Sequence, residues 1–272
     1  MPISMPQFKR TIWSYYRAYR RSMPWREHID PYHVVVSEIM LQQTQVQRVM
    51  EKFPSFIRRF PTWRALALAS TADVLSEWSG LGYNRRALYL KRIAEHITEG
   101  GATSGSLPDT FDGLRALPGI GPNTAGSILA FAYNIPHPFI ETNIRSVYIH
   151  FFFKNKRKVH DSRLLPLIAK SLDTENPREW YYALMDYGTH LKKTMRNPSR
   201  TSAHHIKQST FKGSNRELRA HILRMILVAP LSHKRLVLHL TKTHPKEQIE
   251  LNLINLEKEG FIIRTQNIYS VA

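Results

Sequence analysis

Helical spacing of apolar residues runs through residues 1–200 of this 272-residue chain, and it constrains the fold more strongly than any other feature. Apolar side chains recur every three or four positions, as they do along the buried face of an α-helix. No clear alternation of apolar and polar residues, which would indicate a strand, interrupts this pattern. The segments with helical spacing are 8–21, 31–42, 44–59, 85–98, 124–133, 143–153, 162–172 and 177–192. The sequence therefore predicts a mostly α-helical fold.

A polar and basic stretch, residues 194–215, separates these helices from a smaller C-terminal pattern. Its composition, almost without apolar residues, indicates a linker. The adjacent His204 and His205 could bind a metal ion, but we favour a solvated loop because no further ligand lies at a suitable spacing. Beyond the linker, three helical segments precede two short strands around 265–267, the element order of a winged helix. We expect a helical domain at 1–195, a linker at 196–214 and a small winged-helix-like (α+β) domain at 215–272.

The chain carries 39 Lys and Arg against 21 Asp and Glu, which gives a net charge of +18. Such an excess attracts polyanions, and nucleic acid is the most common partner of this kind, ahead of an anionic membrane surface. A basic protein without such a partner is the alternative. The longest uncharged run, 116–140, contains several prolines and glycines, so we expect no membrane span. Residues 1–26 lack the apolar core of a signal peptide, so we expect an intracellular protein.

The sharpest turn signal is "LPGIG", residues 117–121, at the start of the helical segment 124–133. Gly119 and Gly121 allow the backbone to turn tightly and to expose N–H groups at a helix N-terminus, which suits a phosphate. A Pro-Gly-x-Gly run by itself is usually an ordinary loop. Here a short helical segment, 110–117, precedes the turn, so the pattern indicates a helix-hairpin-helix that binds the DNA backbone without reading bases.

Glu38 stands in the apolar run "VVVSEIML". A desolvated carboxyl group has a raised pKa and is suited to donate a proton, whereas the alternative is an exposed acid on an amphipathic helix. Thr44 and Gln47 match a capping box, so we expect a new helix to begin at Thr44. Gln42 and Gln43 would then lie at a corner between two helices, where their amides could enter a DNA stack or bond to base edges.

Five sequence blocks carry a family resemblance. They are "PWR" (24–26), "SEIMLQQTQV" (37–46), "WSGLGYNRRA" (78–87), "LPGIGPNTAGSIL" (117–129) and "MDYG" (185–188). In this order, over about residues 5–195, they resemble the MutY-type adenine DNA glycosylases of the helix-hairpin-helix superfamily that includes endonuclease III. The resemblance implies two helical lobes and a target nucleotide that is flipped out of double-stranded DNA into a pocket.

The resemblance also implies roles for individual residues. Glu38 matches the acid that protonates adenine at N7. The residues implied near the base pocket and the opened stack are Trp25, Arg26, Gln42, Gln43, Tyr83, Asn123 and Asn143. Those expected to bind the DNA backbone are Leu117, Gly119, Gly121, Thr124, Arg85 and Arg86, with a monovalent cation possible at the hairpin 117–121. Cleavage of an N-glycosidic bond needs an acid for the base and a carboxylate for the sugar, as in glycoside hydrolysis.

Two positions depart from the family in the proposed reaction centre. The second family carboxylate is an Asp, whereas the matching stretch "IETNI" (140–144) carries Glu141, whose side chain is one methylene longer. We favour catalysis by Glu141, and the alternative is that it only stabilises the N-terminus of its helix. Bifunctional relatives have a lysine where this chain has Asn123, so Schiff-base chemistry and strand cleavage are not expected. Asn123 leaves the choice of base open.

Two larger features of the family are missing. Most members hold an iron–sulfur cluster with four cysteines, but this chain has no cysteine and carries basic residues in that region, so we expect no cluster and no other cofactor. The segment 211–272 also differs from the MutY-type domain that recognises 8-oxoguanine, which leaves the opposite base open. The lysines and arginines in the cluster region are Lys192, Lys193, Arg196 and Arg200.

These observations predict a monofunctional, monomeric glycosylase that removes a mispaired base, adenine first, from duplex DNA in base excision repair. In a prokaryote it would act in the cytoplasm, at the nucleoid. A thymine or uracil mismatch glycosylase of the same superfamily is one alternative. A non-catalytic duplex-binding protein on this scaffold is another, and a winged-helix regulator with a degenerate enzyme lobe is a third.

Overall fold

The computed structural model describes residues 3–99, 106–207 and 210–272. Backbone contacts divide the chain into two compact units. The first consists of Met1–Glu38 and Leu107–Lys207, and the second of Ile39–Ser106 and Gln208–Ala272. Helix α3 (Pro31–Leu41) passes from the first unit into the second. Among the described residues, no helix is both long and apolar enough to cross a bilayer.

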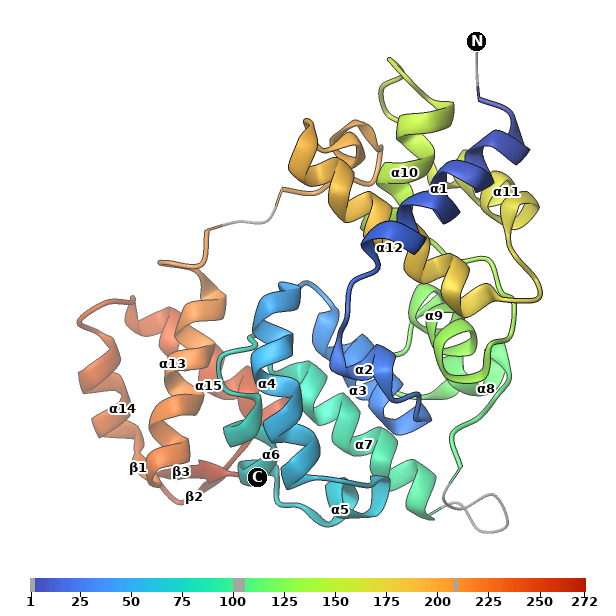
Figure 1. Cartoon of the computed structure of the whole chain (residues 1–272). Helices are drawn as coiled ribbons and strands as arrows, with labels where there is room; N and C mark the ends of the chain where they lie inside the picture. Colours follow the sequence, from blue (N-terminus) through green and yellow to red (C-terminus); the bar gives the residue numbers. More distant parts are fainter. Residues whose placement is uncertain (1–2, 100–105, 208–209) are drawn as a thin grey trace. The chain divides into compact units, whose positions relative to one another are not determined.

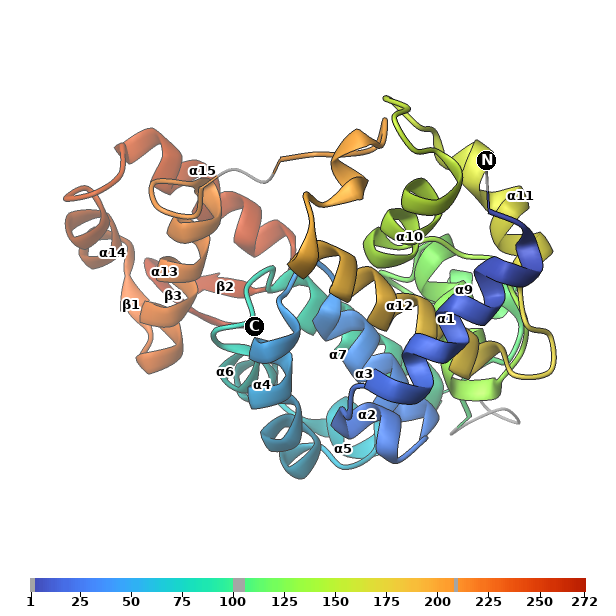
Figure 2. The same cartoon turned by 45° about the horizontal axis from the view of Figure 1, so that its top comes forward.

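The first unit is built around α12, which packs against α1, α9 and α10 (Figure 1). Its helices besides the start of α3 are α1 (Met5–Tyr19), α2 (Pro24–Glu27), α8 (Phe111–Ala116), α9 (Pro122–Tyr133), α10 (Thr142–Phe152), α11 (Asp161–Ser171), α12 (Pro177–Thr194) and the 3-10 helix η2 (Pro198–Thr201). Helix α1 begins at its cap Ser4 and buries Phe8, Ile12 and Tyr16 along one face. The Phe8 ring meets Trp180 of α12 edge-on, with centroids 6.0 Å apart. The two helices lie side by side in both views (Figure 2).

The second unit combines a helical part with the C-terminal module. Its helices are α4 (Val46–Arg59), α5 (Trp63–Leu68), α6 (Thr71–Trp78), α7 (Arg85–Glu99), α13 (Asn215–Val228), α14 (His233–Leu240) and α15 (Lys246–Lys258). Three antiparallel strands, β1 (Leu231–Ser232), β2 (Ile262–Thr265) and β3 (Ile268–Val271), pair in the order β1-β3-β2. In this register Tyr269 lies opposite both Leu231 and Arg264. The module buries a core that includes Ile222, Leu253 and Phe261.

The predicted fold class is confirmed: the chain is mostly helical and ends in a small α+β module. All eight segments with helical spacing are helices, within a few residues at their ends. The spacing did not reveal the short helices α2, α5 and α6, nor the strand β1, because two to eight residues show too little periodicity.

Two local predictions need correction. Helix α4 begins at Val46 with Gln45 as a cap that makes no side-chain bond, so the capping box at Thr44 is wrong. The Thr44 hydroxyl is instead engaged with the Leu81 carbonyl and with Arg86. The segment 196–214 is also more than a linker. Its first part forms η2, which packs on α10, and Ser202 pairs with Val159.

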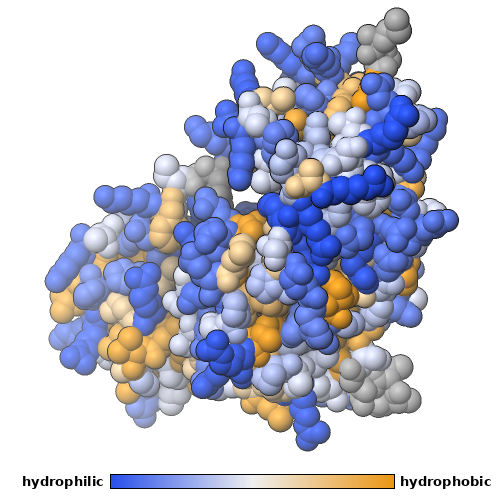
Figure 3. Space-filling view, in the orientation of Figure 1, coloured by the Kyte–Doolittle hydropathy of each residue, from blue (hydrophilic) through white to orange (hydrophobic). Residues whose placement is uncertain are grey.

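Figure 3 shows a largely hydrophilic face with apolar side chains in separate patches. Hydrophilic side chains dominate this view, as the excess of Lys and Arg leads one to expect. The apolar residues with helical spacing are instead found in the core, among them Val35, Phe56 and Ile144, each fully buried.

Candidate functional site

Glu38 lies in α3 with its carboxyl group bonded to α9. The hydroxyl of Ser127 lies 2.5 Å from Oε2 of Glu38, and the Glu38 side chain is half-buried. Burial raises the pKa of Glu38 to about 7, against the opposing effects of the Ser127 hydrogen bond and the positive charge of Arg26. The negative charge of Glu141 raises that pKa further. Glu38 is therefore a carboxylic acid that can hold its proton near neutral pH.

Glu141 immediately precedes α10 and caps it. Its Oε1 accepts hydrogen bonds from the backbone N–H groups of Asn143 and Ile144, at 2.6 and 2.8 Å. Its Oε2 accepts a bond from the Asn143 side-chain amide at 3.1 Å. The capping role suggested as the alternative is thus present, and the same carboxylate also acts on the pKa of Glu38. The Glu141 carboxylate therefore both caps α10 and provides a negative charge that acts on Glu38.

Lys192 of α12 completes this cluster. Its Nζ donates a hydrogen bond to Oδ1 of Asn143 at 2.7 Å, so the Asn143 side chain is held from both sides. Burial lowers the pKa of Lys192, while the charge of Glu141 opposes this shift. From the sequence, Lys192 is only one of several basic residues in the region where most family members hold their cluster, because nothing in the sequence indicates its distance from Asn143.

Gly188 of the "MDYG" block explains how α12 approaches Asn143 so closely. A Cβ at position 188 would lie 2.5 Å from the Asn143 carbonyl oxygen and 2.6 Å from its Cβ. These distances are far shorter than van der Waals contact, so only glycine fits here without displacing the start of α10. The block thus has a packing reason for its glycine.

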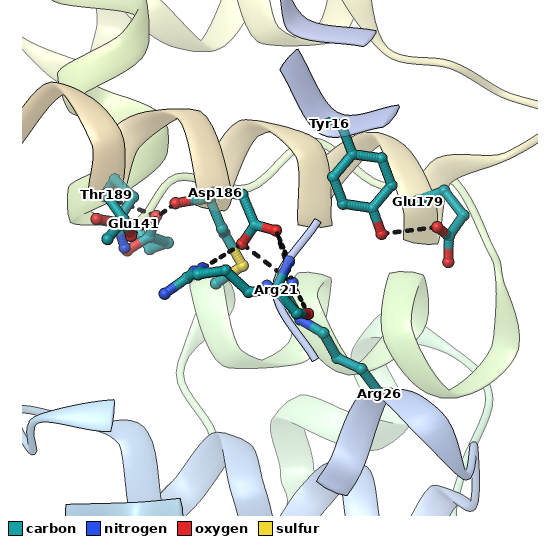
Figure 4. Close-up of polar contacts among 9 residues, drawn as sticks. Tyr16, Arg21, Arg26, Glu141, Glu179, Asp186 and Thr189 are labelled. Atoms are coloured by element: carbon teal, nitrogen blue, oxygen red, sulfur yellow. Dashed lines mark hydrogen bonds and ion pairs between the residues drawn. The ribbon is translucent and has the colours of Figure 1, made fainter. Parts of the chain in front are cut away.

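Asp186 of the same block binds two arginines (Figure 4). Arg21 Nε lies 2.6 Å from Asp186 Oδ1, and Arg26 Nη1 lies 3.0 and 3.1 Å from the two carboxylate oxygens. Arg26 is 5% exposed, and its guanidinium lies 4.2 Å from the ring centroid of Tyr182. Trp25, beside it on α2, is also buried. Arg26 is therefore fixed in place, and its charge acts on Glu38.

The predicted hairpin is present between α8 and α9. Gly119 has φ +77°, which requires glycine, and Gly121 is the N-cap of α9 in extended backbone. The Leu117 side chain is buried, so only the backbone of that residue is available at the turn. Asn123 is exposed at the start of α9 and accepts a bond from the Ile140 N–H at 3.2 Å. Thr124 follows, partly exposed.

The predicted corner residues belong to the second unit. Gln43 and Tyr83 are not glycines, yet their φ values are +56° and +49°, in the left-handed region. Gln42 is half-buried and Gln43 is exposed. All three residues line one groove of about 1070 Å³. Strained backbone of this kind persists where the surrounding structure imposes it, and it is often found at functional sites.

The structure contradicts the prediction that Arg86 binds the DNA backbone. Arg86 is 6% exposed, so it is unavailable to contact a phosphate. Its guanidinium instead donates to backbone oxygens at the end of α3, to the loop before α7 and to the Thr44 hydroxyl. These acceptors are Ile39, Met40, Gln42, Leu81, Gly82 and Tyr83 through their carbonyls, and Thr44 Oγ1. Arg86 therefore joins the loop of Gln42 to the loop of Tyr83. Burial lowers its pKa to about 10.

The predicted site residues thus fall into two groups. The first unit holds Glu38, Glu141, Trp25, Arg26, Asn123, Asn143 and the hairpin, and the second holds Gln42, Gln43, Tyr83, Arg85 and Arg86. Ser127, Lys192 and Asp186 were missed as contributors, although Asp186 lies in a quoted block. Within the described part of the chain, no three His, Asp or Glu side chains cluster as metal ligands.

Comparisons with known proteins identify the family that this chain resembles. The profile of the HhH-GPD superfamily base excision DNA repair proteins matches residues 36–165. An adenine DNA glycosylase of Mycobacterium tuberculosis (strain CDC 1551 / Oshkosh) is 43% identical over 135 residues, which are 49% of this chain and 44% of that protein. A thymine/uracil-DNA glycosylase of Pyrobaculum aerophilum is 31% identical over 192 residues, 68% of this chain and 83% of that protein.

Solved structures show the same fold. A thermostable thymine-DNA glycosylase superposes with a TM-score of 0.63 at 21% identity, over 71% of this chain and 90% of that chain. Endonuclease III from a non-covalent DNA complex gives a TM-score of 0.58 at 13% identity, over 73% of this chain and 98% of that chain. The chain spans about half the length of the curated adenine DNA glycosylases that it matches.

Proposed function

Because this chain belongs to the HhH-GPD superfamily of base excision DNA repair proteins, we propose that it is a monofunctional DNA glycosylase. It extrudes a mispaired base from duplex DNA and hydrolyses the bond between that base and deoxyribose. Adenine is the base we propose first. The observation that carries this proposal is Glu38, a carboxyl group that is hydrogen-bonded to Ser127 and whose pKa is raised to about 7 by burial and by the charge of Glu141.

The chemistry assigns a different task to each carboxyl group. Glu38 donates its proton to a ring nitrogen of the base, N7 in the case of adenine, so that the base leaves as a neutral molecule. The sugar then carries oxocarbenium character, which the negative charge of Glu141 stabilises. Water adds its oxygen to C1′ and releases a proton, which leaves an abasic site and a free base. Asn143 and Lys192 hold Glu141 in place for this role.

No lysine stands at position 123, so we propose hydrolysis without strand cleavage. The hairpin 117–121 supports DNA binding through the N–H groups at the start of α9, and a monovalent cation at its carbonyls stays a prediction. Because the proposed substrate is chromosomal DNA, we place the protein inside the cell. We also propose that it acts as a monomer. An iron–sulfur cluster has no part in this proposal because the chain offers no thiolate.

A thymine or uracil glycosylase is the second candidate. It is favoured by one observation, the thymine/uracil-DNA glycosylase of Pyrobaculum aerophilum, of which this chain covers 83%. Adenine is favoured by the adenine DNA glycosylases, which are up to 43% identical over shorter stretches. The two functions share the acid and the fold, so only the substrate separates them.

The test is a panel of duplexes that each carry one mispair, with adenine, thymine or uracil as the candidate base. After incubation with the full chain, hot alkali cuts the strand wherever a base has been lost. We expect alkali-dependent cuts at adenine and none without alkali. Glu38→Gln should lose at least about a hundredfold in rate, the contribution of a general acid. Cuts only at thymine or uracil select the second candidate, and no cuts on any duplex leave a non-catalytic DNA-binding protein.

A further inference from the structure

The groove of the second unit joins the corner residues to the C-terminal module. It is formed by the turn after α3, by the loop between α6 and α7, and by α13. We propose that this groove binds the phosphate backbone of duplex DNA, so that the C-terminal module is part of the DNA-binding surface. This inference rests on the proposed function for its ligand, duplex DNA, and assigns the module a role in binding that ligand.

The first argument for this proposal is the positive charge of the groove. Six arginines line it, and no Asp or Glu is among its described lining residues: they are Arg48, Arg85, Arg86, Arg216, Arg219 and Arg224. A concave surface with charges of one sign concentrates the opposite charge near it. Guanidinium groups bind phosphate oxygens in a bidentate manner, which makes arginine suited to a nucleic-acid backbone.

Four of these arginines have internal partners: Arg86 is buried on backbone carbonyls, Arg216 bonds to Tyr83, and Arg85 and Arg219 share one acid. Glu259 accepts from Arg85 at 2.7 Å and from Arg219 at 2.6 Å, one on each carboxylate oxygen. This bridge fastens α13 to α7 and thereby fixes the walls of the groove. Arg48 and Arg224 are exposed and form no ion pair within residues 3–99, 106–207 and 210–272. These two are the charges best placed to meet an external phosphate.

Tyr83 links the groove to the predicted site of base extrusion. Arg216 of α13 donates a hydrogen bond to the Tyr83 hydroxyl at 2.9 Å, and its guanidinium lies 5.4 Å from the ring centroid. Tyr83 and Gln43 have left-handed backbone on the same lining. The C-terminal module therefore supports a residue that the sequence predicts beside the opened stack. A duplex that is opened near Tyr83 would continue along α13.

Duplex DNA fits this groove better than an acidic protein segment. The wall of α13 places Arg216, Arg219 and Arg224 among the partly exposed apolar side chains of Ala220 and Leu227. Charged groups interleaved with apolar surface match a backbone that alternates phosphate with deoxyribose. With a volume of about 1070 Å³, the groove is also larger than a site for one small anion.

The test compares two double variants of the full chain. Arg48→Gln/Arg224→Gln removes two charges from the groove, and Arg58→Gln/Arg64→Gln removes two exposed charges of the same unit that do not line it. Fluorescence anisotropy of a labelled mispaired duplex gives Kd over a series of salt concentrations. The slope of log Kd against log salt should fall by about 2 for the groove variant, one per lost phosphate contact, and by much less for the control.

The possible results separate the groove from the proposed function. Arg48→Lys/Arg224→Lys should restore most of the slope, whereas a groove variant with the wild-type slope and Kd would overturn the proposal. A groove variant that loses binding to an acidic peptide but not to DNA would also overturn it. If the wild-type chain binds duplex through the groove but releases no base, the proposed function fails and the groove stands. If it releases base while the groove variant binds like the control, the groove fails and the function stands.

Discussion

The hydroxyl oxygen of Ser127 lies 2.5 Å from Glu38 Oε2 and 3.0 Å from the carbonyl oxygen of Thr124. A hydroxyl has one proton, so it cannot donate to both oxygens at once. When Glu38 is protonated, it donates to Ser127, which in turn donates to Thr124. When Glu38 is ionised, the Ser127 proton turns toward it. Ser127 is 3% exposed, so its hydroxyl bonds to one of these two oxygens and not to solvent, and its orientation follows the protonation state of the acid.

We therefore expect Ser127→Ala to change the pH dependence of base release. The hydroxyl lowers the pKa of Glu38, so its removal raises that pKa and keeps the acid protonated to higher pH. The decline in single-turnover rate on the alkaline side should move upward in pH. The maximal rate should fall by no more than about tenfold, because one hydrogen bond contributes about 1 kcal/mol.

Ser37→Ala is the matched control. Ser37 is a buried serine beside Glu38 whose hydroxyl bonds to the Val34 carbonyl of its own helix at 2.9 Å. This variant should keep the wild-type pH profile even if its stability changes. An unmoved alkaline limb in Ser127→Ala would show that the hydroxyl does not act on the acid.

Glu38 should also lower the stability of the folded protein at neutral pH. Its carboxyl has an ordinary pKa of 4.5 and a folded-state pKa of about 7, so below 4.5 both states are protonated. As pH rises from 4.5 to 7, the unfolded chain releases the proton first and folding becomes less favourable. Glu38→Gln does not titrate, so its advantage in urea-measured free energy of unfolding should grow to about 3 kcal/mol above pH 7.

Asp73→Asn provides the opposite case. The pKa of Asp73 is lowered by its hydrogen bonds with Ser70 and then Arg59, so its contribution to stability is present above the ordinary pKa and is lost as pH falls. The Asp73→Asn variant should therefore lose stability relative to wild type as pH rises through that range. A Glu38→Gln difference that is constant with pH would contradict the raised pKa of Glu38.

Part of the site was predictable because its signals are local. The apolar neighbours of Glu38 predict its desolvation, and the glycine at position 119 predicts the turn that its φ of +77° requires. Ser127 was not predictable as the partner of Glu38, because 89 residues separate them and no periodic pattern encodes that contact. The same reason explains Lys192, whose partner Asn143 lies 49 residues away.

Arg86 was misjudged for a different reason. An arginine in a basic stretch usually points to solvent, and the sequence offers no acid that would draw it inward. Its partners are backbone carbonyls at the C-terminal end of α3 and in the loop before α7, and carbonyls have no sequence signature. The same contacts occupy Thr44, which is why the capping box there does not form.

The Arg86→Lys variant should therefore be much less stable than the wild type, although it keeps the positive charge. A lysine has three donors and cannot reach the acceptors that the planar guanidinium serves, so several buried carbonyls lose their partners. We expect a loss of about 3–5 kcal/mol in free energy of unfolding, measured by urea denaturation. The neighbouring Arg85→Lys, exposed and paired with Glu259, should lose no more than about 1 kcal/mol. Equal losses of stability in the two variants would show that the Arg86 hydrogen bonds do not hold the two loops together.

Gly188→Ala tests the close approach of α12 to Asn143. The added methyl group would lie 2.5 Å from the Asn143 carbonyl, so α10 must shift and carry Glu141 with it. We expect about 1–3 kcal/mol of destabilisation and at least a tenfold lower rate of base release. Gly121→Ala, where nothing lies within 4 Å and φ is −86°, should leave thermal stability nearly unchanged. A Gly188→Ala protein with wild-type stability and rate would refute this account.

Glu141 has two roles that substitution can separate. The side-chain carbonyl of Glu141→Gln can still accept from the Asn143 and Ile144 N–H groups, but the negative charge is gone. Glu141→Ala loses both the cap and the charge, and a lost cap costs about 1 kcal/mol. We expect both variants to lose at least a hundredfold in single-turnover rate, about 2.7 kcal/mol of transition-state stabilisation. The alanine variant should lose more stability than the glutamine variant, which gives up only the bond from the Asn143 side chain.

Thr62→Ala isolates the effect of a cap, because Thr62 caps α5 through the Ala65 N–H at 3.1 Å. This variant should lose about 1 kcal/mol in free energy of unfolding, which lowers the melting temperature by a few degrees. Its rate of base release should stay at the wild-type value. If Glu141→Gln also kept the wild-type rate, Glu141 would serve α10 alone. The stabilisation of the sugar would then have to come from another group, and the pairing of Glu38 with a second carboxylate would carry no catalytic meaning.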